Sequence, residues 1–252
     1  MSFNVSAEAY DRFMGMHSRL LAPQLVDLSR LGPSDRVLDV GCGPGALTTE
    51  LVMRLGAGSV AAVDPSESFV GAARARHPGI DVRRAGAEAL PYGYGVFDAA
   101  LAQLVVHLMA DPAAGLREMA RVTRPDGVVT ACVWDFAGGR APLSPFWRAA
   151  LELDLTSRDE SGLAGAREGQ LVELFASAGL RHIEDRVLVA RARYSSFDEW
   201  WEPFGFGVGP AGAVFQKLDA SQRARVRARC QELLPPAPFE LVSFAWAARG
   251  IV

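Results

Sequence analysis

The stretch Arg36–Leu51, RVLDVGCGPGALTTEL, decides the fold of this chain. Its apolar run Val37–Val40 ends abruptly at Gly41, Gly43 and Gly45, and a helix-like pattern follows at once. This order predicts a buried strand, a tight turn and the N-terminus of a helix. Glycine has no Cβ and accepts positive φ, so the backbone of such a turn can approach a ligand closely.

A second apolar run, Val60–Val63, follows the glycine turn and ends on Asp64. An acid at the end of the second strand of such a unit accepts hydrogen bonds from the hydroxyls of a ribose. The turn and Asp64 together predict an enzyme that uses a nucleoside cofactor. They do not decide which cofactor, since a dinucleotide site uses the same pattern.

Apolar runs alternate with helical patterns through the first half of the chain. Each expected strand is a continuous apolar run, which favours an α/β fold with a parallel sheet covered by helices on both faces. The expected strands are Arg36–Val40, Val60–Val63, Ile80–Arg84, Phe97–Ala102 and Val128–Trp134, the last after a turn at Arg124–Gly127. The expected helices between them are Ala46–Leu55, Ser66–Arg76 and Pro112–Val122.

The pattern changes after Trp134. Residues 1–31 predict a helical cover at the start of the chain, and two more strands are expected at Arg181–Ala192 and Glu240–Arg249. Residues 136–169 and 195–236 are long connections for a compact sheet, and long connections are uncommon unless they have a function. We expect them to form a cap or lid on a single domain spanning 1–252.

Composition excludes several classes of protein. The formal net charge is −3 with both signs spread along the chain, so no basic footprint for nucleic acid is present. The three cysteines, Cys42, Cys132 and Cys230, lie far apart without metal-ligand spacing, and no metal site is expected. No signal peptide or membrane-spanning stretch is recognised. A cytoplasmic protein that does not act on a membrane is the expectation.

Five motifs in order resemble those of class I S-adenosylmethionine-dependent methyltransferases of the small-molecule type. They are VLDVGCGPG, AVDPSE, AEALPY, FDAALAQLVVHLM and EMARVTRPDGVV, and they cover residues 36–134. The resemblance implies a Rossmann-like, doubly wound seven-stranded sheet of order 3-2-1-4-5-7-6 whose last strand is antiparallel. It also implies S-adenosylmethionine as the cofactor and transfer of its methyl group to an oxygen, nitrogen or carbon atom of a small molecule.

The resemblance also implies which residues bind the cofactor. In AEALPY, many relatives have an acid just before the alanine, where this chain has Gly86, so the hydrogen bond to adenine would come from Glu88 or from backbone. Three of these residues could instead have a purely structural role. Asp39 would then stabilise the turn, Gln103 would be an ordinary loop residue, and Tyr10 would pack the N-terminal helix against the sheet. The implied cofactor-binding residues are Tyr10, Asp39, Gly41, Cys42, Gly43, Asp64, Pro65, Ser66, Ala87, Glu88 and Gln103.

The sequence indicates the residues of the acceptor site less clearly than those of the cofactor site. His107, a few residues past the fourth strand, is the first candidate for a general base, with a packed helix residue as the alternative. Trp134 and Asp135 end the fifth strand at the same edge of the sheet and are expected to line the acceptor pocket, with Asp135 as a second candidate for the base. Trp200, Trp201 and Phe204 would form either an aromatic acceptor wall or the core of the cap.

Two other outcomes stay open at this point. The chain could bind S-adenosylmethionine without catalysis, or it could be an NAD(P)-dependent oxidoreductase. Pro44 in the glycine turn disfavours the oxidoreductase, and so does the end of the sequence directly after the last expected strand, because a dinucleotide fold usually adds further parallel strands. The expected partner is a small methyl acceptor, and the expected assembly is a monomer or a homodimer.

Overall fold

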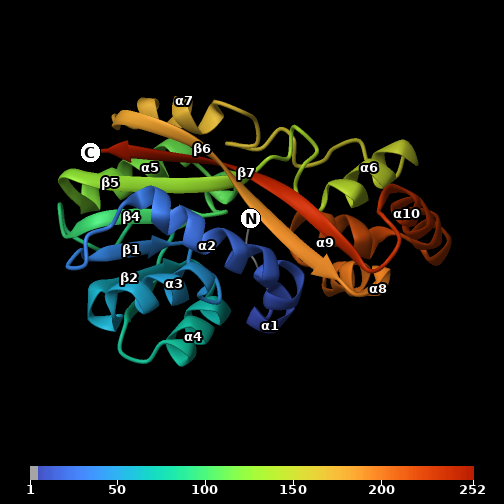
Figure 1. Cartoon of the computed structure of the whole chain (residues 1–252), viewed down its shortest axis with the longest axis horizontal. Coiled ribbons are helices and arrows are strands. Elements are labelled where there is room, and N and C mark those ends of the chain that lie inside the picture. Colours follow the sequence, from blue (N-terminus) through green and yellow to red (C-terminus); the bar gives the residue numbers. More distant parts are fainter. Residues whose placement is uncertain (1–4) are drawn as a thin grey trace.

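One seven-stranded sheet organises the described part of the chain, residues 5–252 of this computed structural model (Figure 1). The strand order is β3-β2-β1-β4-β5-β7-β6, as the resemblance implies. The five strands from β1 to β5 pair in parallel, and β7 runs antiparallel to both of its neighbours. The strands are β1 Val37–Val40, β2 Val60–Asp64, β3 Asp81–Arg84, β4 Phe97–Gln103, β5 Thr123–Trp134, β6 Arg181–Tyr194 and β7 Phe239–Ile251.

The central strands are buried on both faces. Every residue of β1 and β2 is buried, which is why both read as continuous apolar runs instead of alternating patterns. The register sets Asp39 of β1 between Ala62 of β2 and Leu101 of β4. The carboxyl ends of these three strands therefore meet at one edge, where open α/β sheets bind their ligands.

Helices cover the sheet on both faces (Figure 1). Helix α2 packs against α3, β5 and β6, while α5 and α7 contact each other and cover β5 and β7. A π-helical turn, Asp11–Gly15, joins α1 to α2, and we call residues 7–29 the N-terminal helical segment. The helices around the sheet are α1 Ala7–Tyr10, α2 Met16–Ser29, α3 Ala46–Leu55, α4 Glu67–Arg76, α5 Pro112–Val122 and α7 Gln170–Ser177.

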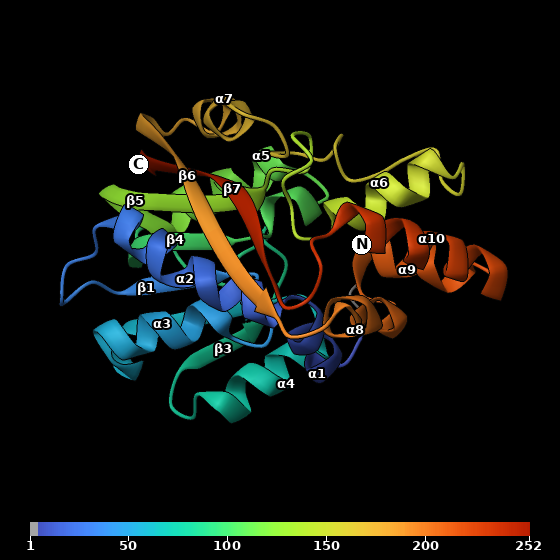
Figure 2. The same ribbon diagram turned by 45° about the vertical axis from the view of Figure 1, so that its right-hand side comes forward.

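A second group of helices lies beyond the end of the sheet at which β5 terminates (Figure 1, Figure 2). We call this group the cap. The long strands β6 and β7 extend past the other strands to reach it. The cap helices are α6 Ser144–Glu152, α8 Phe197–Trp201, α9 Gly209–Lys217 and α10 Ala220–Leu233, with a 3-10 segment at Glu202–Phe206.

Aromatic side chains form the core of the cap. The rings of Phe146 and Phe204 stack with centroids 4.6 Å apart, Trp200 meets Phe204 edge-on at 5.0 Å, and Trp201 meets Phe215 at 5.4 Å. Such pairs stabilise a packing by about 0.5–1.5 kcal/mol each beyond area burial. The two long connections therefore meet in one aromatic cluster, although they lie far apart in the sequence.

One strand begins earlier than the sequence pattern predicts. The expected turn at Arg124–Gly127 belongs to β5, because Thr123 already pairs with Phe97. The register then shifts, so that Ala99 pairs with Val128. The four residues between form an irregularity in the strand, which proline and glycine tolerate. None of the helices within residues 5–252 is both long enough and apolar enough to cross a membrane.

Candidate functional site

The glycine turn between β1 and α3 is fixed by β2. The backbone N–H groups of Gly41 and Cys42 both donate to the carbonyl oxygen of Val63, at 2.8 and 3.0 Å. Gly41 has a φ of +73°, and a Cβ atom at this position would lie 2.5 Å from Cγ2 of Val105. A side chain is therefore excluded at Gly41 both by the backbone conformation and by the close approach of the segment after β4.

Asp64, the last residue of β2, is held by the turn and by the start of α4. Its Oδ2 accepts from the N–H of Gly43 at 2.9 Å, and its Oδ1 accepts from the N–H of Ser66 at 2.8 Å. Burial raises the pKa of this carboxyl, and the two backbone hydrogen bonds oppose the rise. Each carboxylate oxygen keeps a free lone pair, so the fixed carboxylate can still accept from two further hydroxyl groups.

A cavity of about 460 Å³ opens at the carboxyl ends of β1, β2 and β4. We call it the cofactor cavity. Its walls include most of the residues that the sequence assigns to cofactor binding: Tyr10, Gly41, Gly43, Asp64, Pro65, Ser66, Ala87, Glu88 and Gln103. Asp39 and Cys42 are buried and do not line the cavity.

The buried Asp39 carboxyl is only partly satisfied. Its Oδ2 accepts from the hydroxyl of Thr48 at 2.6 Å, whereas Oδ1 has no hydrogen-bond partner among the described residues. Burial raises the pKa of Asp39 to about 7, with a smaller contribution from the nearby charge of Asp64. An unpaired buried carboxylate oxygen favours a positively charged or N–H-bearing group next to it.

Glu88 supports the loop that flanks the cavity. Its Oε1 accepts from the N–H of Ala110 at 2.8 Å, which ties the loop to the segment before α5. A Cβ atom at Gly86 would lie 3.2 Å from Oε2 of Glu88. Glycine at position 86 therefore leaves room for the Glu88 carboxylate beside the cavity.

Gln103 connects the sheet to the N-terminal helical segment. Its Nε2 donates to the carbonyl oxygen of Ser18 at 2.9 Å, and its buried Oε1 has no partner among the described residues. The amide thus presents an unused acceptor from a residue of the cavity wall. Gln103 is thus the last residue of β4 with a buried amide and not the loop residue that the sequence leaves open as an alternative.

A second cavity of only about 50 Å³ adjoins the cofactor cavity. We call it the inner cavity. It shares Tyr10, Leu104 and Leu108 with the cofactor cavity, and its other walls include the predicted residues His107 and Trp134. The indole N–H of Trp134 and Nδ1 of His107 are both buried without a hydrogen-bond partner in the described structure.

Glu160 is a wall residue of the inner cavity that sequence reasoning missed. It is 4% exposed, and its Oε2 accepts from the indole N–H of Trp147 at 2.8 Å. Burial raises the pKa of Glu160 to about 7 and lowers the pKa of His107 to about 4. Of these two candidate bases, the carboxyl therefore has the pKa closer to neutral pH.

Asp135 does not line any of the cavities described here. Its carboxylate accepts from Arg140, from the indole N–H of Trp246 at 3.0 Å and from the N–H of Gly138 at 2.9 Å. It is 1% exposed. These three donors orient the loop after β5, so the structure supports a conformational role for Asp135 instead of the predicted place in the acceptor wall.

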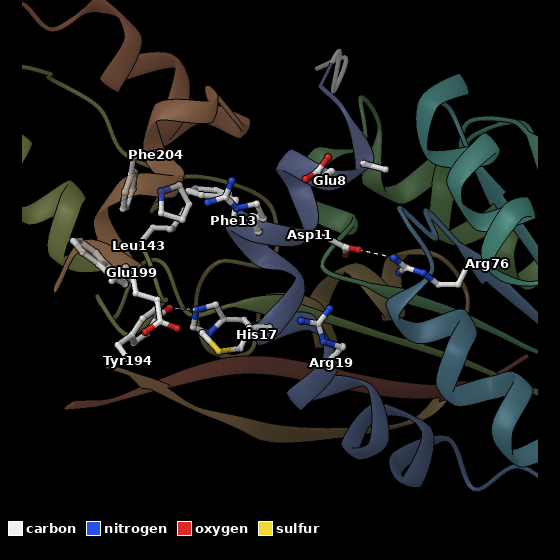
Figure 3. Close-up of a pocket in the computed structure, with 15 residues that line it drawn as sticks. Glu8, Asp11, Phe13, His17, Arg19, Arg76, Leu143, Tyr194, Glu199 and Phe204 are labelled. Carbon is white, nitrogen blue, oxygen red and sulfur yellow. Dashed lines mark hydrogen bonds and ion pairs between the residues drawn. The ribbon is translucent and has the colours of Figure 1, made fainter. Parts of the chain in front are cut away.

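The predicted cap aromatics divide between two positions. Trp200 and Phe204 line a third cavity of about 550 Å³, which we call the outer cavity (Figure 3). Trp201 packs in the aromatic core of the cap and lies outside the three cavity walls. All three side chains thus belong to the aromatic core of the cap, and Trp200 and Phe204 also face a cavity, so their place in an acceptor wall stays a prediction.

The cysteines and other potential metal ligands form no second site in residues 5–252. Cys42, Cys132 and Cys230 are buried and unpaired, and burial raises the pKa of Cys132 and of Cys230 to about 12. Thiols with such pKa values stay protonated at neutral pH and are poor nucleophiles. Across the same residues, no group of three or more histidine, cysteine, aspartate or glutamate side chains is placed to hold a metal ion.

Comparison with known proteins agrees with this geometry. Residues 38–131 match the family model of the methyltransferase domain. A demethylmenaquinone methyltransferase of Mycolicibacterium vanbaalenii is 44% identical over 105 residues, covering 41% of this chain and 43% of that protein. A malonyl-[acyl-carrier protein] O-methyltransferase of Hahella chejuensis is 34% identical over 128 residues, covering 50% and 46%. The matches thus span less than half the length of these curated relatives.

The fold extends the similarity beyond the matched segment. The structure of a geranyl diphosphate methyltransferase in complex with S-adenosylmethionine superposes with a TM-score of 0.55 at 15% identity, covering 93% of this chain and 85% of that one. At this identity the likeness shows the fold alone. Residues 38–131 thus match a methyltransferase domain, and the described chain has the sheet order that the resemblance to class I S-adenosylmethionine-dependent methyltransferases implies.

Proposed function

We propose that this chain transfers the methyl group of S-adenosylmethionine to a small-molecule acceptor by in-line attack on the sulfonium methyl. The observation that carries the proposal is the cofactor cavity, in which the glycine turn and the fixed carboxylate of Asp64 face one space of about 460 Å³. The volume is in the range of pockets that bury cofactors and drug-sized ligands.

The described residues fit S-adenosylmethionine both at its ribose and at its methionine portion. Asp64 would accept from the ribose hydroxyls, and the turn at Gly41 and Gly43 would let the backbone approach the cofactor closely. The unpartnered Oδ1 of Asp39 and Oε1 of Gln103 are acceptors suited to the ammonium group of the methionine portion. Because Asp39 is buried and does not line the cavity, its effect on the ammonium group would be transmitted by the backbone of the glycine turn.

S-adenosylmethionine supplies a methyl group that its sulfonium already activates. The protein has to align the acceptor with that methyl group and exclude water, and alignment can account for much of the barrier reduction. The inner cavity is placed for this role because it adjoins the cofactor cavity through Tyr10, Leu104 and Leu108. Its small size leaves room for the reacting group of an acceptor but not for a whole molecule.

Glu160 is our first candidate for the base that an oxygen or carbon acceptor would need. A carboxyl with a pKa near 7 is partly ionised at neutral pH and matched to general-base catalysis, whereas an imidazole with a pKa near 4 is a much weaker base. His107, the base expected from the sequence, would then orient the acceptor through its unpartnered Nδ1. A proton leaving the acceptor would pass to the Glu160 carboxylate.

The residues that would select the acceptor lie mainly outside the matched domain. The relatives act on demethylmenaquinone and on malonyl-[acyl-carrier protein], two different acceptors, although they match the same kind of segment. In this chain Tyr10, Phe13, Trp134, Glu160 and Val208 all come from outside residues 38–131 and line the inner cavity. The N-terminal helical segment, the end of β5 and the inserts of this chain would therefore select its acceptor.

A screen of small metabolites for transfer of a radiolabelled methyl group from S-adenosylmethionine tests the proposal. We expect at least one small molecule to be labelled, and the label to be lost with Asp64→Ala. If the chain binds S-adenosylmethionine and labels none of a broad acceptor set, a non-catalytic binding protein becomes the better account. Binding of NADH in its place would favour an oxidoreductase.

The pH profile of the labelling reaction identifies the base. With Glu160 as the base, turnover rises through about pH 7, and Glu160→Gln removes this rise. With His107 as the base, the rise lies near pH 4, and turnover is flat from pH 6 to 8. A profile unchanged by either Glu160→Gln or His107→Ala would show that no base on these two residues is needed.

A further inference from the structure

One side chain in the wall of the cofactor cavity comes from outside the sheet and its connections. Tyr10 of helix α1 lines this cavity together with Gly43 and Asp64. A Cβ atom at Gly43 would lie 3.9 Å from Cε1 of Tyr10, and the Tyr10 ring packs against Phe69 of α4 with centroids 5.2 Å apart. Burial of the Tyr10 hydroxyl raises its pKa to about 12, and the nearby charge of Asp64 adds to the rise. The cavity is therefore complete only while α1 is held beside the glycine turn.

Helix α1 has little packing of its own. None of its residues, Ala7–Tyr10, is fully buried, whereas Leu21 and Leu25 of α2 are both 0% exposed and fix that helix in the core. A helix of a single turn is not stable by itself. The position of α1 therefore depends on side-chain contacts made by α1 and by the π-helical turn that follows it.

These contacts lie on two sides. We call α1 and the π-helical turn, residues 7–15, the flap. Toward the cap, Phe13 meets Phe204 edge-on with centroids 5.4 Å apart. Toward α4, the carboxylate of Asp11 lies 2.6 Å from the guanidinium of Arg76 (Figure 3). The ion pair is thus the polar contact that ties the flap to the cofactor-binding half of the fold.

Arg76, the last residue of α4, also holds the glycine turn. Its Nη1 donates to the carbonyl oxygen of Pro44 at 2.8 Å, and its Nη2 donates to Asp11. One guanidinium therefore connects α4, the glycine turn and the flap, a task that suits its planar set of N–H donors. Neither Arg76 nor Asp11 lines the cofactor cavity, so neither is placed to contact the cofactor.

Asp11 has a second cation beside it. A Cβ atom at Gly15 would lie 2.8 Å from Oδ1 of Asp11 and 3.1 Å from Nη1 of Arg19. Gly15 thus leaves the space between these two side chains open. Arg19 belongs to α2, which continues directly from the flap, so its charge cannot tie the flap to another part of the fold. Of these two cations, only Arg76 can do so.

We propose that Arg76 is a positioning residue for the cofactor: by holding Asp11, it keeps Tyr10 in the wall of the cofactor cavity and strengthens binding of S-adenosylmethionine. This inference rests on the proposed function and adds the contact that completes the cavity. When the ion pair is lost, the flap keeps its aromatic contacts but is no longer tied to the glycine turn. Tyr10 then leaves the cavity wall more often, and the cofactor binds more weakly.

The sign of the change in affinity separates positioning from a direct electrostatic effect. S-adenosylmethionine is a net cation at neutral pH, because its sulfonium and ammonium groups outnumber its single carboxylate. Through charge alone, Arg76→Gln would tighten cofactor binding and Asp11→Asn would weaken it. Through the position of Tyr10, both variants weaken binding, by about fivefold at the upper end for a partly exposed ion pair. Calorimetric titration of S-adenosylmethionine at pH 7 and constant ionic strength measures both.

Hydrogen exchange in the cofactor-free protein tests the contact without a ligand. Amide hydrogens of residues 7–15 should exchange about fivefold faster in Arg76→Gln and in Asp11→Asn than in wild type, while exchange in the sheet stays unchanged. Arg167→Gln is the matched control, since it breaks an exposed ion pair with Glu173 at 2.8 Å. It should alter neither exchange of the flap nor cofactor affinity.

Several results would overturn the inference. They are equal or tighter cofactor binding by Arg76→Gln, opposite effects of the two variants on affinity, and flap exchange that neither variant changes. If wild type itself binds no S-adenosylmethionine, the proposed function fails and the inference fails with it. If wild type and Arg76→Gln bind the cofactor equally well, only the positioning role of Arg76 is refuted.

Discussion

Replacing Glu160 with glutamine should remove part of the pH dependence of this protein's stability. Burial raises the pKa of the folded-state carboxyl from 4.5 to about 7. Between these two values the folded state binds more protons than the unfolded state, so the free energy of unfolding falls as pH rises. Above about pH 7 the carboxyl is ionised in both states, and the free energy of unfolding falls no further. Glutamine carries no titrating proton and keeps an amide oxygen for the Trp147 indole.

The size of the effect follows from the pKa difference. One pKa unit corresponds to about 1.4 kcal/mol, so the buried Glu160 lowers stability by about 3 kcal/mol between pH 4 and pH 8. Asp39, whose pKa is also raised to about 7, contributes in the same direction. His17 and His107, whose pKa values burial lowers to about 4, contribute in the opposite direction. These three groups are present in both proteins and cancel in the comparison.

Urea unfolding at pH 5, 6, 7 and 8 measures the effect directly. The stability of Glu160→Gln relative to wild type should increase by about 2–3 kcal/mol across this range, most steeply from pH 5 to pH 7. Glu168→Gln, which changes an exposed glutamate of the same connection, should follow wild type throughout. Parallel pH dependences for wild type and Glu160→Gln would refute the assignment of a buried carboxyl at this position.

Two further variants test the turn and the carboxylate behind it. Gly41→Ala forces positive φ on alanine and brings its Cβ against Val105, so urea unfolding should show a loss of about 2–4 kcal/mol, partly recovered by adding Val105→Ala. Full stability in Gly41→Ala would contradict the observed contact. Thr48→Val removes the hydroxyl that bonds Asp39 and should cost about 1–3 kcal/mol at pH 8, measured in the same way. An unchanged urea midpoint would show that the hydroxyl is dispensable.

The fold was largely predictable because its signals are local. The continuous apolar runs around Val37–Val40 and Val60–Val63 predict parallel strands, and the glycines between them predict the turn. The sheet order came from the resemblance of five motifs to a known family, and the structure confirms it. The early start of β5 at Thr123 was missed because it depends on pairing with Phe97, which no local pattern shows.

The acceptor side was much less predictable, because its cavities join residues that are distant in sequence. The contact between His17 and Tyr194 spans 177 positions. Glu160 lies in a connection rich in glycine and alanine, where an acid normally indicates exposure. Its burial follows from the position of Trp147 in the cap. Asp135 is the opposite case: it ends a strand at the ligand-binding edge, but its carboxylate is buried among donors from Arg140 and Trp246, which the local sequence does not indicate.

Calorimetric titration of S-adenosylmethionine into wild type and Asp64→Ala tests the central claim most directly. We expect wild type to bind one equivalent with a dissociation constant from about 1 μM to below about 1 mM, the range usual for metabolites. Asp64→Ala, which loses the carboxylate fixed by Gly43 and Ser66, should show no measurable binding. Binding of NADH without binding of S-adenosylmethionine or S-adenosylhomocysteine, or equal affinity in the variant, would contradict the account.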